Sequence, residues 1–227
     1  EVPEDEVEAE FLLGADELTR QEWMQLKDRY EKEPDARHEI LIQMALRLER
    51  LGFNEEAEKR IREGLRMVPP GDDREGTILE IKVQLASFLL RQQRYEGAKT
   101  VAGEVLAAGR TEEEKLLGRD LLIESLLGSG RKLIAEREYD LAFDYARTII
   151  DESETVHQQA TGYLLMAEAR VGMGDSEGAL DEMAYLTAHF VRYPEDPVEL
   201  RMAGARLFET LGEISDSLSL LQGLPET

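Results

Sequence analysis

The sequence predicts an all-α protein built as an α-solenoid of antiparallel helix pairs. Along most of the 227 residues, apolar side chains recur every three or four positions, which places them on one face of a helix. Glycines, prolines and polar turn residues divide this pattern into helix-sized segments. A short motif, in which a turn leads through acidic residues to a small residue, appears five times at intervals of 41, 44, 37 and 38 residues. A repeat of this period is typical of helical solenoids.

Composition and charge agree with stacked helices and argue against several classes of function. Hydrophobic residues make up 42% of the chain and aromatic residues only 6%, which favours an aliphatic core. The net charge of −22 argues against nucleic acid as a partner, because phosphate binding needs clustered Lys and Arg. This charge promotes solubility through self-repulsion and leaves a basic partner open.

The absence of cysteine excludes thiol catalysis, thiolate zinc sites and disulfides. No apolar run approaches the ~18 residues of a membrane-spanning helix, so no direct membrane insertion by this segment is expected. Localisation stays open between cytoplasm and periplasm. Because the chain begins at Glu1 rather than Met, we expect a processed protein or an excised segment.

The N-terminal part is predicted to be a tail and a single helix. Residues 1–15 form the acidic tail, and residues 16–34 form a packing helix. Thr19–Glu22 reads as the capping box of that helix, because a hydroxyl and a Glu three residues later satisfy each other's free amides. Trp23 and Tyr30 share one face, which we expect to cover the first repeat rather than to form a ligand cage.

Residues 35–227 are predicted to be the repeat domain, with five helix pairs. The best-formed pair spans Leu41–Pro69 and turns at Gly52–Asn54. The later pairs cover about 74–109, 112–150, 155–190 and 198–224, with Pro194 and Pro197 before the last.

The third pair begins with a long predicted helix, from a capping box at Thr111–Glu114 to about Glu136. It contains Gly128 and Gly130, each of which weakens a helix interior by roughly 1 kcal/mol relative to Ala. The segment is therefore one kinked helix, two helices, or a helix that another packs against closely. For Gly130 we favour close packing.

The five copies of the motif share a small residue in the second helix of each pair. These residues are Ala57, Ala98, Ala142, Ala179 and Ser217. A second small residue recurs in the first helices, at Ala45, Ala86, Gly130, Ala167 and Ala205. On these residues, and on Pro69 at the end of its pair, the chain resembles the tetratricopeptide repeat family over about 36–224. The resemblance implies a right-handed superhelix of five divergent repeats, although the intervals exceed the family's ~34 residues.

The first helices of that family line a concave surface, so the resemblance implies a groove for a protein or peptide partner. The implied groove residues are Ile42, Leu46, Arg50, Val83, Leu90, Arg91, Leu127, Arg131, Ile134, Leu164, Val171, Met202 and Arg206. Aliphatic residues flanked by arginines suit an amphipathic helix or an apolar peptide with mixed charge. Alternatively, the aliphatic residues pack the core or form a surface for self-association.

Two further activities are not expected. The family's clamp for a free C-terminal carboxylate uses Lys and Asn, where this chain has Ile42, Leu46 and Val83. Catalysis is not expected either, because the three histidines lie far apart and none stands beside a carboxylate at metal-ligand spacing. We interpret them as surface or capping residues; they are His38, His157 and His189.

The sequence thus favours a non-enzymatic protein–protein interaction scaffold, with no cofactor or metal. One alternative is a self-assembling structural or assembly factor that works as a homo-oligomer. Another is a regulatory repeat domain of a larger bacterial envelope or secretion system.

Overall fold

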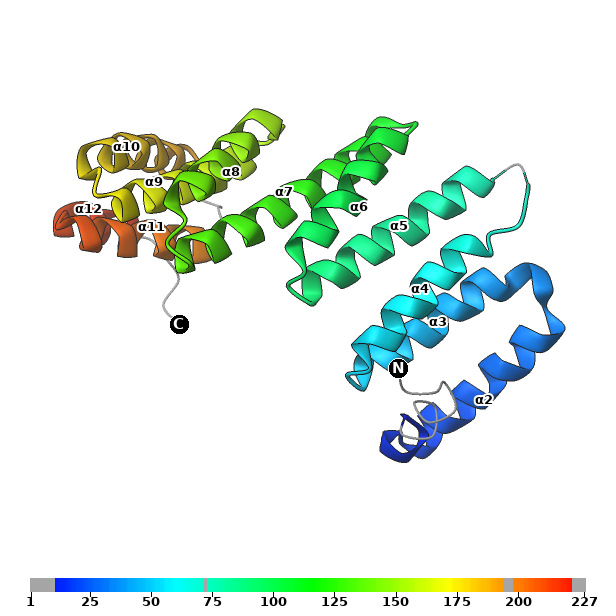
Figure 1. Cartoon of the computed structure of the whole chain (residues 1–227). Helices are drawn as coiled ribbons and strands as arrows, with labels where there is room; N and C mark the ends of the chain where they lie inside the picture. The colour runs from blue at the N-terminus through cyan, green and yellow to red at the C-terminus, as the bar shows by residue number, and fades with distance from the viewer. Residues whose placement is uncertain (1–10, 72, 194–197, 222–227) are drawn as a thin grey trace. The chain divides into compact units, whose positions relative to one another are not determined.

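The computed structural model describes residues 11–71, 73–193 and 198–221, and every regular element in these ranges is a helix (Figure 1). The all-α part of the prediction is therefore confirmed. Contacts divide the chain into two compact units, residues 1–118 and residues 119–227. Residues 1–10 of the tail predicted at 1–15, the prolines at 194 and 197, and the predicted helix end at 222–224 lie outside the described residues. The rest of the predicted tail is not a tail, because residues 11–14 are helical and Phe11 is fully buried.

Unit 1 contains a leading helix followed by two helix hairpins. Its elements are α2 (Glu17–Lys32), the 3-10 turn η1 (Pro34–Ala36), α3 (Arg37–Arg50), α4 (Asn54–Arg66), α5 (Arg74–Arg91) and α6 (Tyr95–Ala108). Along the chain, α2 packs on α3, α3 on α4, α4 on α5 and α5 on α6. Buried aliphatic and aromatic side chains such as Leu41, Phe88 and Val105 fill the spaces between them.

Helix α2 begins earlier than the sequence predicts. Asp16 is its N-cap, and its Oδ1 accepts a hydrogen bond of 2.7 Å from the Thr19 amide. The predicted capping box at Thr19–Glu22 is therefore wrong, because a carboxylate one turn earlier satisfies the free amides and suits the positive end of the helix. Trp23 is 3% exposed and its ring lies 4.4 Å from that of Phe11, so this face of α2 is buried as expected.

Unit 2 contains the remaining helices. Its elements are the greater part of α7 (Glu112–Ala135), α8 (Tyr139–Glu152), α9 (Val156–Met173), α10 (Ser176–Arg192), α11 (Val198–Leu211) and α12 (Ile214–Leu221). Helix α8 packs on α9, α9 on α10, and α11 on α12, while α10 and α9 also contact α11.

Helix α7 is a single helix, which excludes the alternative of two separate helices. Its capping box is confirmed, because the Glu114 amide donates to Thr111 Oγ1 at 3.1 Å and the Thr111 amide donates to Glu114 Oε2 at 3.0 Å. A Cβ placed on Gly130 would lie 2.4 Å from Cδ2 of Leu165 on α9. Close helix packing at Gly130 is therefore confirmed.

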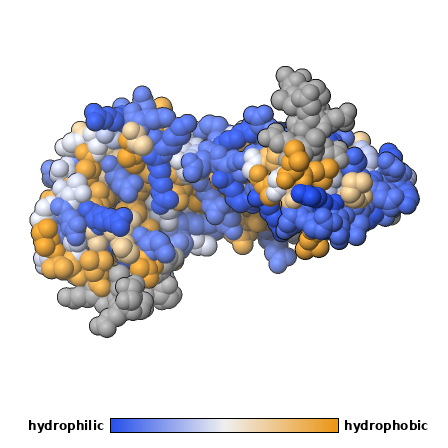
Figure 2. Space-filling model, turned by 90° about the horizontal axis from the view of Figure 1, so that it is seen from below, coloured by the Kyte–Doolittle hydropathy of each residue, from blue (hydrophilic) through white to orange (hydrophobic). Residues whose placement is uncertain are grey.

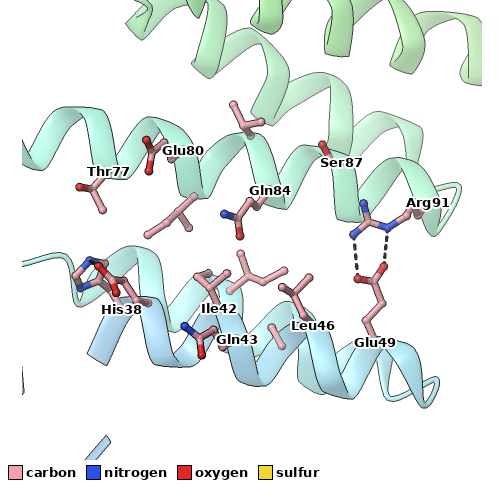
Figure 3. Close-up of a pocket in the computed structure, with 15 residues that line it drawn as sticks. His38, Ile42, Gln43, Leu46, Glu49, Thr77, Glu80, Gln84, Ser87 and Arg91 are labelled. Atoms are coloured by element: carbon pink, nitrogen blue, oxygen red, sulfur yellow. Dashed lines mark hydrogen bonds and ion pairs between the residues drawn. The ribbon is translucent and has the colours of Figure 1, made fainter. Parts of the chain in front are cut away.

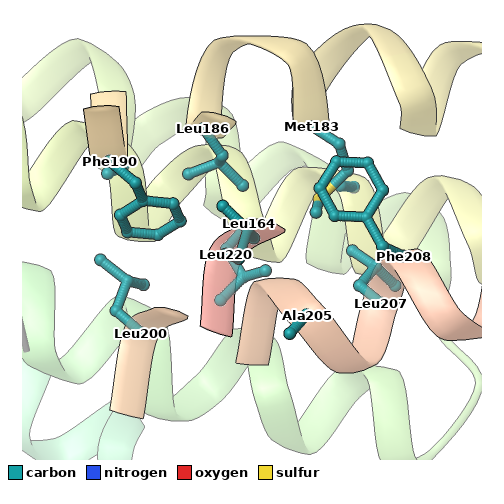
Figure 4. Close-up of a cluster of buried hydrophobic side chains, with 11 residues drawn as sticks. Leu164, Met183, Leu186, Phe190, Leu200, Ala205, Leu207, Phe208 and Leu220 are labelled. Atoms are coloured by element: carbon teal, nitrogen blue, oxygen red, sulfur yellow. The ribbon is translucent and has the colours of Figure 1, made fainter. Parts of the chain in front are cut away.

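The main core of unit 2 joins α9, α10, α11 and α12 (Figure 4). Its large members are Leu164, Met183, Leu186, Phe190, Leu200, Leu207, Phe208 and Leu220. The Arg201 side chain is buried beside this cluster, 7% exposed. Its Nη2 donates to the carbonyl oxygens of Phe190 and Tyr193 at 3.0 and 3.1 Å, so the guanidinium caps the C-terminal end of α10.

All five hairpins in the described residues turn through the same backbone motif. The turn residue has a positive φ in each: Gly52 at 85°, Gln93 at 56°, Arg137 at 66°, Gly174 at 81° and Gly212 at 87°. Its amide donates to the carbonyl three residues back, and the next amide donates to the carbonyl five residues back. This is the Schellman arrangement, which satisfies the free carbonyls of a helix end. The small residue five positions later is at most 1% exposed in every copy, so the motif read from the sequence marks real hairpins.

Replacing the turn residue Arg137 by glycine is expected to raise the free energy of unfolding by about 0.5 kcal/mol. A left-handed conformation costs a residue with a Cβ roughly 1–2 kcal/mol, and the greater freedom of glycine in the unfolded chain offsets part of that gain. Arg147→Gly in the middle of α8 is the control, expected to lower stability by ~1 kcal/mol. Urea denaturation measures both, and equal losses for the two variants would contradict the argument.

Candidate functional site

A groove of about 490 Å³ opens between α3 and α5, the first helices of the two hairpins of unit 1 (Figure 3). Its lining comes mainly from these helices: His38, Glu39, Ile42, Gln43, Ala45, Leu46 and Glu49 from α3, and Thr77, Glu80, Ile81, Val83, Gln84, Ser87 and Arg91 from α5. Ile61 of α4 completes the lining. This volume is within the usual range of ligand-binding pockets, roughly 300–1,000 Å³.

The order of packing explains why the groove exists. Helix α4 packs against both α3 and α5, so it joins the two hairpins behind the groove. On α3 the lining residues fall at helical spacing, as Glu39, Ile42, Leu46 and Glu49 do. The middle of the groove is apolar, and Leu46 there is 44% exposed. An exposed leucine on a concave wall offers apolar surface to a ligand.

An ion pair closes one end of the groove (Figure 3). Arg91 Nε and Nη2 donate to the two carboxylate oxygens of Glu49 at 2.8 and 2.9 Å, which is a bidentate contact between the hairpins. Hydrogen bonding to Glu49 raises the pKa of Arg91 above its ordinary value. Both charges at this end are therefore compensated.

The other end of the groove contains His38, Thr77 and Glu80 (Figure 3). Glu39 lines the groove too and follows His38 directly on α3, so this end is acidic. Both glutamates are exposed, and among the described residues no lysine or arginine forms an ion pair with either. Arg29, whose charge interacts with Glu39, is itself bidentate to Glu33. This end therefore carries uncompensated negative charge.

His38 is buried in the wall at this end. It is 8% exposed, its Nε2 lies 3.9 Å from Glu39 Oε1, and its Nδ1 is buried without a hydrogen-bond partner in the described structure. His189 is 5% exposed and contacts the rings of Phe190 and Tyr193. The interpretation as surface residues is therefore wrong for these two histidines, because both side chains are buried.

The structure brings together four of the six groove residues that the sequence implies in unit 1. Ile42, Leu46, Val83 and Arg91 all line the groove. Ile42 is only 7% exposed, so it contributes wall rather than open surface. Arg50 and Leu90 lie outside the lining.

In unit 2 the implied residues are dispersed between core and surface. Leu164 is 3% exposed within the core cluster, so its side chain packs the interior. Leu127, Ile134 and Val171 are partly buried against the two core clusters of this unit. The remaining three, Arg131, Met202 and Arg206, are exposed. A hollow in this unit lies instead against α10, α11 and α12, lined by residues such as Leu180, Val191 and Asp216.

The sequence reasoning missed the acidic end of the groove. Glu39 lies three positions before Ile42, and Glu80 three positions before Val83, so both extend the implied faces by one turn. Extending the helical pattern toward each N-terminus would have found them. The burial of His38 had no such signal, because it depends on neighbouring elements.

A partly buried carboxylate, Glu168, lies on α9 in unit 2. Burial raises the pKa of Glu168 above its ordinary value of 4.5, and the charge of Arg131 lowers it in part. Because the folded pKa lies above the unfolded one, the folded chain binds more protons than the unfolded chain between the two values. The ionisation of Glu168 therefore lowers the free energy of unfolding as the pH rises through that window.

Glu168→Gln is accordingly expected to stabilise the protein at pH 7. Its advantage over the wild type should shrink as the pH falls through the raised pKa of Glu168 and vanish below about 4.5, the unfolded value. Thermal unfolding between pH 7 and pH 4 measures this difference. Glu124→Gln, at an exposed position on α7, is the control, and an advantage that persists unchanged at pH 4 would contradict the assignment.

No group of three or more His, Asp or Glu side chains in the described residues has a geometry that could hold a metal ion. Among the described helices, none is both long and apolar enough to cross a membrane. A scan against models of known protein families finds no match for this sequence, and a search of curated proteins finds none either.

Proposed function

We propose that the protein is a non-enzymatic scaffold of the tetratricopeptide type, whose hairpins form an α-solenoid and whose α3–α5 groove binds a segment of a partner protein. The observation that carries the binding role is the groove itself, with an apolar middle and polar ends. The identical turn in five hairpins, followed each time by a buried small residue, supports the repeat assignment.

The groove supplies the physical basis for binding a protein segment. Burying apolar surface contributes about 25 cal/mol per Å², and Leu46 and Val83 still have surface to bury. The ion pair between Glu49 and Arg91 holds one end of both walls in place. The groove therefore loses less conformational entropy when a segment binds. Polar groups at the ends give the segment an orientation.

The contacts in the groove favour binding over catalysis. The Thr77 hydroxyl donates to the Asp73 carbonyl oxygen at 3.2 Å, rather than to His38. A hydroxyl nucleophile needs a base within hydrogen-bond reach, and this arrangement does not provide one. We therefore propose a recognition role for the groove.

The test uses a phage-displayed library of random 12-residue peptides, selected on the full chain. Synthetic copies of the selected peptides are then measured by fluorescence polarisation against the wild type and Leu46→Glu. We expect Leu46→Glu to weaken binding at least about tenfold, because it places a charge where the ligand buries apolar surface. Leu117→Glu is the matched control, since Leu117 is 41% exposed and lies outside the groove. Peptides that bind both variants as well as the wild type would refute the proposed site.

Self-association is a second candidate function, supported by exposed apolar residues in unit 2. Val191 is 80% exposed, Ile214 55% and Leu218 57%, and Figure 2 shows hydrophobic surface on this unit, at the left of the picture. Light scattering across a range of concentrations tests it. A mass that stays monomeric at all concentrations would remove this candidate.

A further inference from the structure

We propose that the segment bound in the α3–α5 groove carries a lysine or arginine, which lies between Glu39 and Glu80. This inference rests on the proposed function of the groove and adds the chemistry of its partner. It assigns the acidic end of the groove to the basic residue and the apolar middle to an aliphatic residue.

The two carboxylates come from facing walls of the groove. Glu39 lies on α3 and Glu80 on α5, and Figure 3 shows Glu80 at the same end as His38 and Thr77. Neither glutamate has a lysine or arginine as an ion-pair partner in the part of the chain that the structure describes. Like charges on facing walls repel each other, and a cation between them turns that repulsion into attraction.

The contrast with the other end of the groove fixes the direction of the segment. There the charges of Glu49 and Arg91 satisfy each other in a bidentate contact. The negative potential of the groove is therefore concentrated at the Glu39 end. A segment with one basic residue binds with that residue at this end, because charge complementarity sets orientation and register.

The apolar middle of the groove provides a surface for the methylene stem of the basic side chain. Lysine and arginine bury their methylene stems against apolar surface while the charged group stays polar. Val83, which is half-buried, offers such surface one turn from Glu80, and the buried Ile42 forms the wall beside it. Leu46 lies seven residues after Glu39 on α3, a separation of roughly 10 Å at 1.5 Å per residue.

That separation sets the sequence pattern of the ligand. About 10 Å corresponds to seven residues of a helix or three residues of an extended segment. We therefore expect a basic residue and an aliphatic residue at one of these two spacings. A free carboxylate or an acidic segment would meet Glu39 and Glu80 with the wrong sign.

The experiment uses the phage-displayed 12-residue library on the full chain, followed by fluorescence polarisation with the selected peptides. The expected result is enrichment of Lys or Arg at one of the two spacings from an aliphatic residue. The double variant Glu39→Gln/Glu80→Gln should weaken binding of these peptides at least about tenfold at low salt, with a smaller loss at high salt. Glu55→Gln/Glu113→Gln is the matched control, because both of its glutamates are exposed and outside the groove.

The outcomes separate this inference from the proposed function. Peptides that depend on Leu46 but lack a basic residue, or that bind the Glu39/Glu80 double variant as tightly as the wild type, overturn the inference alone. A selection that yields no peptide dependent on Leu46 overturns both. Circular dichroism of the variants checks that each is folded, which is expected because the substituted positions are exposed.

Discussion

Arg201→Met is expected to lower the free energy of unfolding by about 2–4 kcal/mol, the range for losing a buried hydrogen-bond network. Methionine keeps most of the apolar length of arginine, so the change chiefly removes the donors to Phe190 and Tyr193. Those carbonyls end α10 and would then be left without a partner. The guanidinium also lies 5.4 Å from the centre of the Phe190 ring, which is a cation–π contact. Methionine is uncharged and does not form this contact.

The same helix supplies the control for this prediction. Arg206 is exposed on α11, five residues after Arg201, and Arg206→Met is expected to change stability by less than about 0.5 kcal/mol. Urea denaturation followed by circular dichroism measures both variants. If the two substitutions lower the free energy of unfolding by the same amount, the buried guanidinium does not stabilise the end of α10.

Gly118→Ala is expected to lower the free energy of unfolding of unit 1 by about 1–3 kcal/mol. A Cβ on Gly118 would lie 2.6 Å from the backbone nitrogen and 2.7 Å from the Cα of Leu106 on α6. Backbone atoms cannot rotate away as a side chain can, so one helix has to move. Helix propensity alone predicts the opposite sign, because alanine is favoured over glycine by ~1 kcal/mol in a helix.

Gly103→Ala isolates that propensity. Gly103 lies within α6, and a Cβ there would point into open space, so the substitution is expected to stabilise by up to about 1 kcal/mol. Thermal unfolding of the two variants should therefore shift in opposite directions. A stabilised Gly118→Ala protein would show that α6 and α7 are not in close backbone contact.

The sequence predicted the hairpins well because their signals are local. The turn at Gly174 and the small residue Ala179 depend on backbone conformation and on contact within one hairpin. The close approach at Gly130 was also predictable, since a glycine inside a long helix needs a reason. The turn involves residues near each other in sequence, whereas the glycine indicated a close neighbour without identifying it as Leu165 of α9.

The site was only partly predictable because it depends on contacts between hairpins. Ile42, Val83 and Leu164 share the same helical pattern, yet Val83 lines a groove and Leu164 is enclosed in a core. Periodicity shows that a helix has a second apolar stripe, but not which neighbour covers it. The pairing of Glu49 with Arg91 depends in the same way on the register of two helices that are 42 residues apart in sequence.

The constant turn within each hairpin restricts where the chain can change length. The turn residue and the buried small residue keep a fixed distance of five positions in all five copies, while the copies themselves are spaced unevenly. The uneven spacing therefore comes from the lengths of the helices and of the connections between hairpins. A whole hairpin is then a natural unit for duplication or exchange, and grafting the α3–α4 and α5–α6 hairpins together would transfer both walls of the groove.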